Sequence, residues 1–168
     1  PTSGQVGTDV TITGTTLRCG GTKVNSATFG SVEVTSIASE SDTEVKVKIA
    51  ERAAGAVDVV LTADTGGTAT ATDGFTYITA GSIDTVEPAS GQVGTEVVIS
   101  GSALRGGGTE VETVTVRGIE AVISTQNDTI VVVRAGASSD LGAGDVILIA
   151  DTGATVTKSN GFTYVAAG

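Results

Sequence analysis

The chain repeats itself along its length. The segment PTSGQVGTDVTITGTTLRCGGTKV at residues 1–24 returns as PASGQVGTEVVISGSALRGGGTEV at residues 88–111, a period of 87 residues. The far ends of the two copies keep this register, since Asp64 matches Asp151. A duplication this regular indicates two copies of one domain. The sequence therefore predicts two successive domains that share one fold.

The junction between the copies is short. It lies near Thr79–Ser82, in the sequence TAGS, which leaves little length for either copy to swing freely. The predicted domains are residues 1–80 and 81–168. We expect them to form a semi-rigid rod to which each domain contributes length.

Composition favours strands and tight turns over helices. Glycine is abundant, with 24 residues, proline is scarce, with 2, and the apolar residues are mostly aliphatic. The clearest strand is TEVKVKI at 43–49, where apolar and charged side chains alternate and so point to opposite faces. Similar runs occur at 9–13, 32–37, 57–63, 68–72 and 75–78, with counterparts 87 positions later apart from a one-residue shift near Thr43 and Thr129. Turn residues separate them at the spacings of a β-sandwich or barrel, so the predicted class is all-β.

The tetrapeptide ADTG occurs in both copies, each time after an apolar run. An aspartic protease presents its catalytic carboxylate in this way, and two copies would supply a pair of carboxylates that shares one proton. Only 17 residues follow Asp151, however, which is too few for the strands that support such a site. We therefore predict hairpin turns, with Asp64 and Asp151 far apart in separate domains.

The residue inventory excludes several chemistries. There is no histidine and one cysteine, Cys19, so the chain cannot build a Ser-His, Cys-His, zinc or haem centre by itself. We expect Cys19 to be a free thiol, with an intermolecular disulfide as the alternative. No catalytic, cofactor-binding or metal-binding residue is predicted. Calcium is left open, because Asp73, Asp84 and Glu87 offer oxygen ligands near the domain junction.

Charge and aromatic content limit the partners. The net charge of -10 repels nucleic acid and anionic membrane surfaces, and two isolated arginines beside Gly-rich loops, Arg18 and Arg105, do not change this. No apolar run approaches the roughly 20 residues of a membrane span. Sugar binding lacks a stacking platform, because there is no tryptophan and four of the five aromatic residues belong to the two GFTY segments.

One strand differs between the copies. Where the first copy has Glu44 and Lys46, the second has Ile130 and Val132 in TIVVVR. One interpretation is that loops of the same domain cover these two side chains. The other is that they form an apolar patch for a neighbouring module or a protein partner. If both side chains are buried inside their own domain, the second interpretation fails.

Two further patterns predict packing. Gly4 and Gly7, with their counterparts Gly91 and Gly94, suit a turn that needs positive φ. The aromatic residues of each GFTY segment are two positions apart, so they should point to one face of the last strand and close the core.

Three separated motifs carry a resemblance to a known family. They are the opening I-x-x-V-x-P-x-S-G-x-x-G-T at 83–95, V-x-I-x-G-x-x-L at 97–104 and G-F-T-Y at 161–164. The first copy shows the same order from Pro1 to the GFTY at 74–77. This order resembles the IPT/TIG family of immunoglobulin-like domains. The resemblance implies two immunoglobulin-like β-sandwiches, of which the first lacks the Ile-x-x-Val edge strand that precedes its proline.

The resemblance also implies a function. Such domains occur in cell-surface receptors, large surface repeat proteins, some transcription factors and starch-active enzymes. We expect a non-catalytic spacer and interaction segment of a long extracellular or cell-surface protein, which contacts a protein partner or neighbouring repeats. The alternatives are accessory domains of a secreted polysaccharide-active enzyme and the dimerisation region of a DNA-binding regulator. Asn127, in the sequence Asn-Asp-Thr, is a candidate N-glycosylation site if the protein is secreted by a eukaryote.

Overall fold

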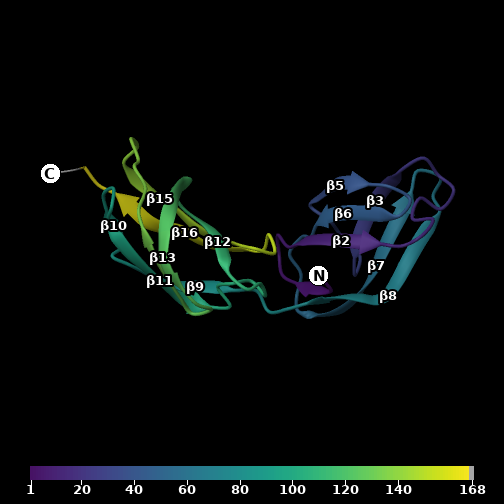
Figure 1. Ribbon diagram of the computed structural model, residues 1–168, viewed down its shortest axis with the longest axis horizontal. Helices are drawn as coiled ribbons and strands as arrows, with labels where there is room; N and C mark the ends of the chain where they lie inside the picture. The colour runs from purple at the N-terminus through teal and green to yellow at the C-terminus, as the bar shows by residue number, and fades with distance from the viewer. Residues whose placement is uncertain (167–168) are drawn as a thin grey trace. The chain divides into compact units, whose positions relative to one another are not determined.

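The computed structural model describes residues 1–166 and divides the chain into two compact units, Pro1–Thr79 and Ala80–Gly168. All regular structure in the described residues is β-strand (Figure 1), as the composition predicted. Within this range there is no helix that could cross a membrane. Four residues separate the last strand of the first unit, which ends at Tyr77, from the first strand of the second unit, which begins at Ser82.

The first unit is a sandwich of two sheets, which Figure 1 shows as separate layers. A five-stranded sheet has the order β1-β8-β7-β3-β4, and a three-stranded sheet has the order β2-β6-β5. The strands are β1 (Ser3–Gly4), β2 (Asp9–Thr13), β3 (Val24–Phe29), β4 (Val32–Glu33), β5 (Ser36–Glu40), β6 (Glu44–Lys48), β7 (Gly55–Ala63) and β8 (Thr68–Tyr77).

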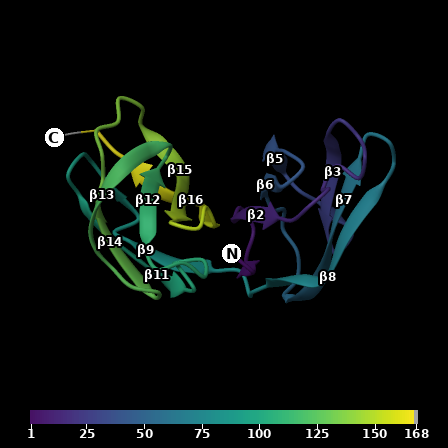
Figure 2. The same ribbon diagram turned by 45° about the vertical axis from the view of Figure 1, so that its right-hand side comes forward.

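The second unit repeats this arrangement with two changes: it has an additional strand, β9, and a single strand, β13, stands where the first unit has β4 and β5. Its eight strands follow the order β10-β16-β15-β12-β13-β14-β11-β9, and β13 passes from one layer to the other (Figure 2). The start of β13 pairs with β12, and the rest pairs with β14. The strands are β9 (Ser82–Glu87), β10 (Ser90–Gly91), β11 (Glu96–Ser102), β12 (Val111–Val116), β13 (Ile119–Gln126), β14 (Ile130–Arg134), β15 (Gly142–Ala150) and β16 (Thr155–Tyr164).

Each unit has its own apolar core. Alternate residues of the central strands point inward, as the period-two pattern predicted, and all five aromatic residues are buried. In each unit the two rings of the GFTY segment pack edge to face, with centroids 5.4 Å apart in the first unit and 5.2 Å in the second. Phe29 joins the first pair, 5.2 Å from Phe75. The prediction that these rings close the core is therefore confirmed.

Three strand predictions need correction. The run at 32–37 is divided between β4 and β5, which belong to different sheets. The runs at 68–72 and 75–78 form one strand, β8, with an irregular pairing opposite Val57 and Val59. Strand β3 was not predicted, because a bulge between Val24 and Ser26 breaks the period of two within VNSATF.

The predicted turn glycines are of two kinds. Gly7 and Gly94 have φ of 85° and 80°, as expected for a turn that favours glycine. Positive φ is absent at Gly4 and at Gly91, where the prediction was wrong. A Cβ added at Gly4 would lie 2.5 Å from the hydroxyl oxygen of Thr8, and one at Gly91 would lie 2.5 Å from that of Thr95. At these two positions glycine is needed for close approach.

Candidate interaction surface

The two residues predicted as a patch lie on the outer side of β14. Strand β14 pairs with β11 on one side and with β13 on the other. Val131 and Val133 point inward and are completely buried, so Ile130 and Val132 point outward. Ile130 is 41% exposed and Val132 is half-buried. Since they are not both buried inside their own unit, the interpretation as a contact patch stays open.

Two further apolar side chains share this surface. Val98 on β11 lies directly opposite Val132, and residues paired in this way project from the same face of a sheet. Val122 on β13 lies opposite Arg134 and is 69% exposed. We call Val98, Val122, Ile130 and Val132 the outer apolar face.

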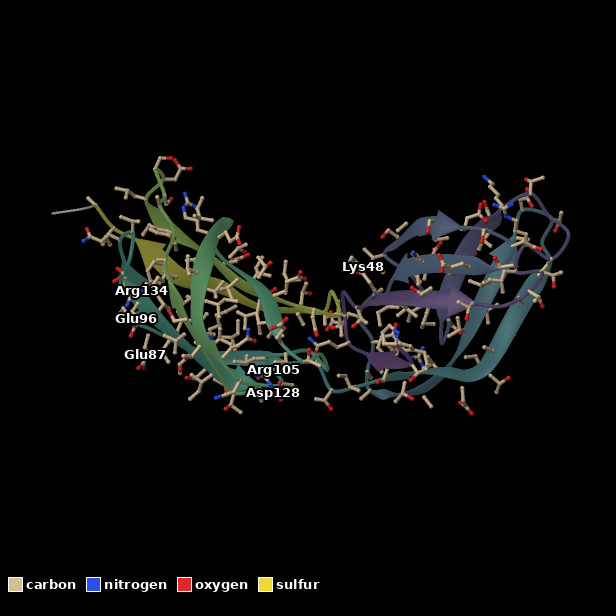
Figure 3. All side chains as sticks on the ribbon, viewed as in Figure 1. Lys48, Glu87, Glu96, Arg105, Asp128 and Arg134 are labelled. Carbon is tan, nitrogen blue, oxygen red and sulfur yellow. The ribbon has the colours of Figure 1, made fainter. Side chains whose placement is uncertain are left out.

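Charged side chains border the outer apolar face. Arg134 Nη2 lies 3.2 Å from Glu96 Oε2, and both side chains are exposed. Glu87 on β9 lies opposite Val98. Figure 3 shows Glu87, Glu96 and Arg134 near one another, with Asp128 toward the other end of the unit. An apolar centre with a charged rim is the usual composition of a protein contact surface.

The same surface of the first unit is polar. Its outward positions on β6 are Glu44 and Lys46, whose side chains lie 3.3 Å apart, and Lys48 pairs with Asp9 at 2.9 Å. Thr11 lies opposite Lys46. Sequence comparison identified Ile130 and Val132 because charges replace them in the other copy. It missed Val98 and Val122, although the unbroken apolar runs VVI and AVI were a signal.

The ADTG segments are hairpin turns, as predicted. Asp64 lies between β7 and β8, where the amide of Gly66 donates to the carbonyl of Ala63 at 2.9 Å. Its carboxylate accepts hydrogen bonds from the amide and the hydroxyl of Thr22 at 3.0 and 2.5 Å. The hydroxyl bond lowers the pKa of Asp64, so the group is held ionised.

The second ADTG turn has the same role in its own unit. Asp151 accepts hydrogen bonds from the amide and hydroxyl of Thr109, and the hydroxyl bond lowers its pKa. Each carboxylate therefore ties its own hairpin to the loop before β3 or β12. This is a structural role, and it differs from that of a carboxylate pair that shares one proton.

The arginines of the Gly-rich loops are held within their own units. Arg18 forms two hydrogen bonds to the carboxylate of Glu40, at 2.9 and 3.0 Å, and Glu40 also accepts the amide of Val24 at 3.0 Å. The bond from Arg18 is the main reason why the pKa of Glu40 is lowered. In the second unit Arg105 donates to the backbone carbonyl of Gln126 at 3.1 Å.

Three further predictions concern calcium, Cys19 and Asn127. Within residues 1–166 no group of three or more His, Cys, Asp or Glu side chains that could hold a metal ion is found. Calcium binding by Asp73, Asp84 and Glu87 remains a prediction. Cys19 is a free, half-buried thiol. Asn127 lies in the turn between β13 and β14, where its side-chain oxygen accepts the amides of Thr129 and Ile130 at 2.8 Å. Its glycosylation remains a prediction.

Comparison with known proteins gives one curated relative and two solved structures of interest. The chain is 37% identical over 107 residues to a cyclomaltodextrin glucanotransferase from Paenibacillus macerans, a match of 61% of this chain and 15% of that enzyme. Two structures of the extracellular region of plexin A4, with domains 1 to 8 and 1 to 10, superpose with TM-scores of 0.51 and 0.56 at 19% and 18% identity. They cover 98% and 99% of this chain, which spans 17% and 15% of those chains.

The family comparison agrees with the motifs found in each copy. The IPT/TIG domain model matches residues 1–77 and again residues 82–164. The two matches fall within the two compact units, and each unit is a β-sandwich. The chain belongs to the IPT/TIG family and consists of two IPT/TIG domains in succession.

Proposed function

We propose that this chain is a non-catalytic interaction segment of an extracellular or cell-surface protein. Its second unit contacts a protein partner or a neighbouring repeat through the outer apolar face, and its first unit acts as a spacer. The supporting observation is that four aliphatic side chains lie outside the core on three neighbouring strands of one unit, where strands β2 and β6 of the other unit carry threonine and charges. An outward strip of this kind contributes little to the fold of its own unit and marks a contact surface.

The similarity to the extracellular region of plexin A4 supports the proposed location, by likeness of fold. The residue types support the absence of catalysis. The two ADTG carboxylates are engaged in turns, and the chain has no histidine. A site for a sugar ring is also not formed by the aromatic residues, because all five are buried.

The test uses a photoreactive amino acid placed in the full-length protein on the cells that make it. One variant carries the probe at Ile130, and the matched control carries it at Glu44, the equivalent position in the first unit. We expect a single protein to be cross-linked through position 130 and not through position 44. The substitution Val132→Lys should abolish this product, because it places on β14 the residue that Lys46 supplies on β6. Equal cross-linking from both positions would show that the outer apolar face is not selective.

The accessory role in a polysaccharide-active enzyme is the second candidate, and the match to a cyclomaltodextrin glucanotransferase favours it. Because no aromatic ring is exposed, we expect the two units to space other domains in such an enzyme without binding sugar themselves. Titration with cyclomaltodextrin, followed by the NMR signals of the full chain, tests this point. Saturable shifts would show a sugar site and would favour the accessory role over the proposed one.

A further inference from the structure

Carboxylates without a partner cation lie on two sides of the outer apolar face. Glu87 on β9 lies opposite Val98 and is exposed. Glu120 is also exposed, and it points to the same side of β13 as Val122, because the buried Ala121 lies between them. Within residues 1–166 neither Glu87 nor Glu120 forms an ion pair.

The nearby guanidinium does not offset these charges. Arg134 is already paired with Glu96, at 3.2 Å between Nη2 and Oε2. Asp128 adds a carboxylate in the turn between β13 and β14, where it accepts the backbone amide of Arg105 at 3.0 Å, which carries no charge. Figure 3 shows Glu87 and Glu96 at one end of the unit and Asp128 toward the other end. We call Glu87, Glu96, Glu120, Asp128 and Arg134 the acidic rim, in which carboxylates outnumber cations by four to one.

The equivalent strands of the first unit carry balanced charges. Glu44 lies 3.3 Å from Lys46, and Asp9 lies 2.9 Å from Lys48, so each of these carboxylates has a cation beside it. An excess of carboxylates is therefore not a general feature of this sheet. It accompanies the apolar side chains of the second unit.

A partner of this surface has to match both of its parts. The apolar centre excludes water only against another apolar surface, and carboxylates at the border of a contact favour cations opposite them. A second copy of this chain would bring one acidic rim against another, and each chain has a net charge of -10. An aliphatic surface bordered by lysine or arginine meets both conditions.

We propose that the partner of the outer apolar face is a basic protein surface, with an aliphatic centre and lysine or arginine side chains around it. This inference rests on the proposed function and names the chemistry of the partner. The aliphatic centre packs on the four side chains of the outer apolar face, and the cations lie beside Glu87 and Glu120. Since the rim is exposed, its charges speed association and select the partner, while the apolar centre holds the complex together.

The test keeps the photoreactive amino acid at Ile130 of the full-length protein on its own cells and adds changes of charge. Glu87→Lys and Glu120→Lys each reverse one charge of the acidic rim. The matched control is Glu33→Lys, because Glu33 is the residue of the first unit that corresponds to Glu120 and is likewise exposed. We expect each rim variant to lower the yield of the cross-linked product by at least about threefold, as for exposed ion pairs, and the control to leave it unchanged. Glu87→Gln should give an intermediate yield.

Salt distinguishes an effect of charge from damage to the fold. Raising NaCl from about 0.15 M to about 1 M shortens the Debye length from about 8 Å to about 3 Å. The yields of the protein with Glu87 and of the Glu87→Lys variant should then agree within about twofold. A difference that stays the same in high salt would mean that charge does not select the partner.

Mass spectrometry of the product identifies the partner segment that is joined to position 130. We expect an aliphatic run with lysine or arginine on both sides and a positive net charge. A neutral or acidic segment, or a segment of this chain itself, would overturn the proposal, and so would equal yields with and without Glu87→Lys at about 0.15 M NaCl. Failure of the proposed function gives a different result, namely no selective product through position 130, and it would remove this inference as well.

Discussion

In the first unit Ile12 is partly exposed, whereas its equivalent in the second unit, Ile99, is completely buried. Leu17 and Leu104 show the same trend, with exposed fractions of 7% and 0%. The residues at these positions are identical, so their own side chains cannot cause the difference. The second unit also contains β9, which pairs with β11 and contributes Ile83 and Val86 to the core. These two positions are therefore more completely buried in the unit that contains β9.

The two units also differ in the outward side chains of the equivalent strands β6 and β14. Both units keep alternating valines that point inward, Val45 and Val47 in one and Val131 and Val133 in the other. The outward positions beside them are charged in the first unit and apolar in the second, while the strand and its pairing are the same. The fold therefore depends on the inward residues, and the outward ones are free to acquire a contact function.

The largest expected effect is the loss of a core ring. Phe162→Ala should lower the free energy of unfolding of the second unit by about 3–5 kcal/mol, because this ring is completely buried. Phe75→Ala in the first unit should cost less, because Phe75, although buried, lines a pocket of about 250 Å³ that neighbouring side chains leave unfilled. Urea unfolding followed by the NMR signals of each unit measures both values. Equal losses would mean that this pocket does not weaken the first core.

How far the sequence could predict this fold is clear from particular strands. The period of 87 residues, the alternation in β6 and the paired rings of GFTY depend on local pattern, and all three are found in the structure. Strand β3 escaped prediction because its bulge breaks the alternation and because Asn25, Ser26 and Ala27 have weak strand preference. The division of 32–37 into β4 and β5 reflects a change of sheet, which depends on tertiary packing.

The next effect concerns Ile99 on β11 and its equivalent Ile12 on β2. Ile99→Ala should cost about 2–5 kcal/mol in the second unit, as is usual for a buried isoleucine. Ile12→Ala should cost less than half as much in the first unit, because its side chain is already partly in water. The same unfolding experiment measures both. A loss at Ile12 as large as that at Ile99 would show that the side chain of Ile12 is fully buried in solution.

Half of the outer apolar face could be predicted from the sequence. Comparison of the two copies identified Ile130 and Val132, because an apolar residue in place of a charge is visible in the sequence. Val98 and Val122 were missed because their neighbourhood depends on strand register. Val98 meets Val132 only through the pairing of β11 with β14, which no local pattern reports.

A smaller effect concerns the two tyrosine hydroxyls. Tyr164 Oη donates to the carbonyl of Gly136 at 3.1 Å, whereas the buried hydroxyl of Tyr77 has no hydrogen-bond partner among the described residues. Tyr164→Phe should therefore cost about 1 kcal/mol in the second unit. Tyr77→Phe should leave the first unit unchanged or stabilise it, because it removes an unpaired buried polar group. Comparable destabilisation by both substitutions, measured by urea unfolding, would show that Tyr77 finds a partner in solution.

The smallest effect is a difference in acid stability that depends on one residue. Glu40 links Arg18 and the amide of Val24 in the first unit, whereas Gln126, which does not titrate, bonds the amide and the carbonyl of Val111 in the second. Folding lowers the pKa of Glu40, mainly through the bond from Arg18. The stabilisation that ionised Glu40 gives to the first unit is therefore complete above the pKa of the unfolded state, about 4.3. It is lost as the pH falls through the lower pKa of the folded state.

The ADTG carboxylates do not produce this difference, because hydrogen bonds from Thr22 and Thr109 lower the pKa of Asp64 and of Asp151 in the same direction. Both units should thus lose stability in acid, and the first should lose more below about pH 4.3. Thermal unfolding between pH 7 and pH 3, followed unit by unit, measures the two slopes. Glu40→Gln is the matched control, since it gives the first unit the side chain of the second and should remove the additional loss. If the slope of the first unit is unchanged in this variant, the bond between Arg18 and Glu40 does not set its acid stability.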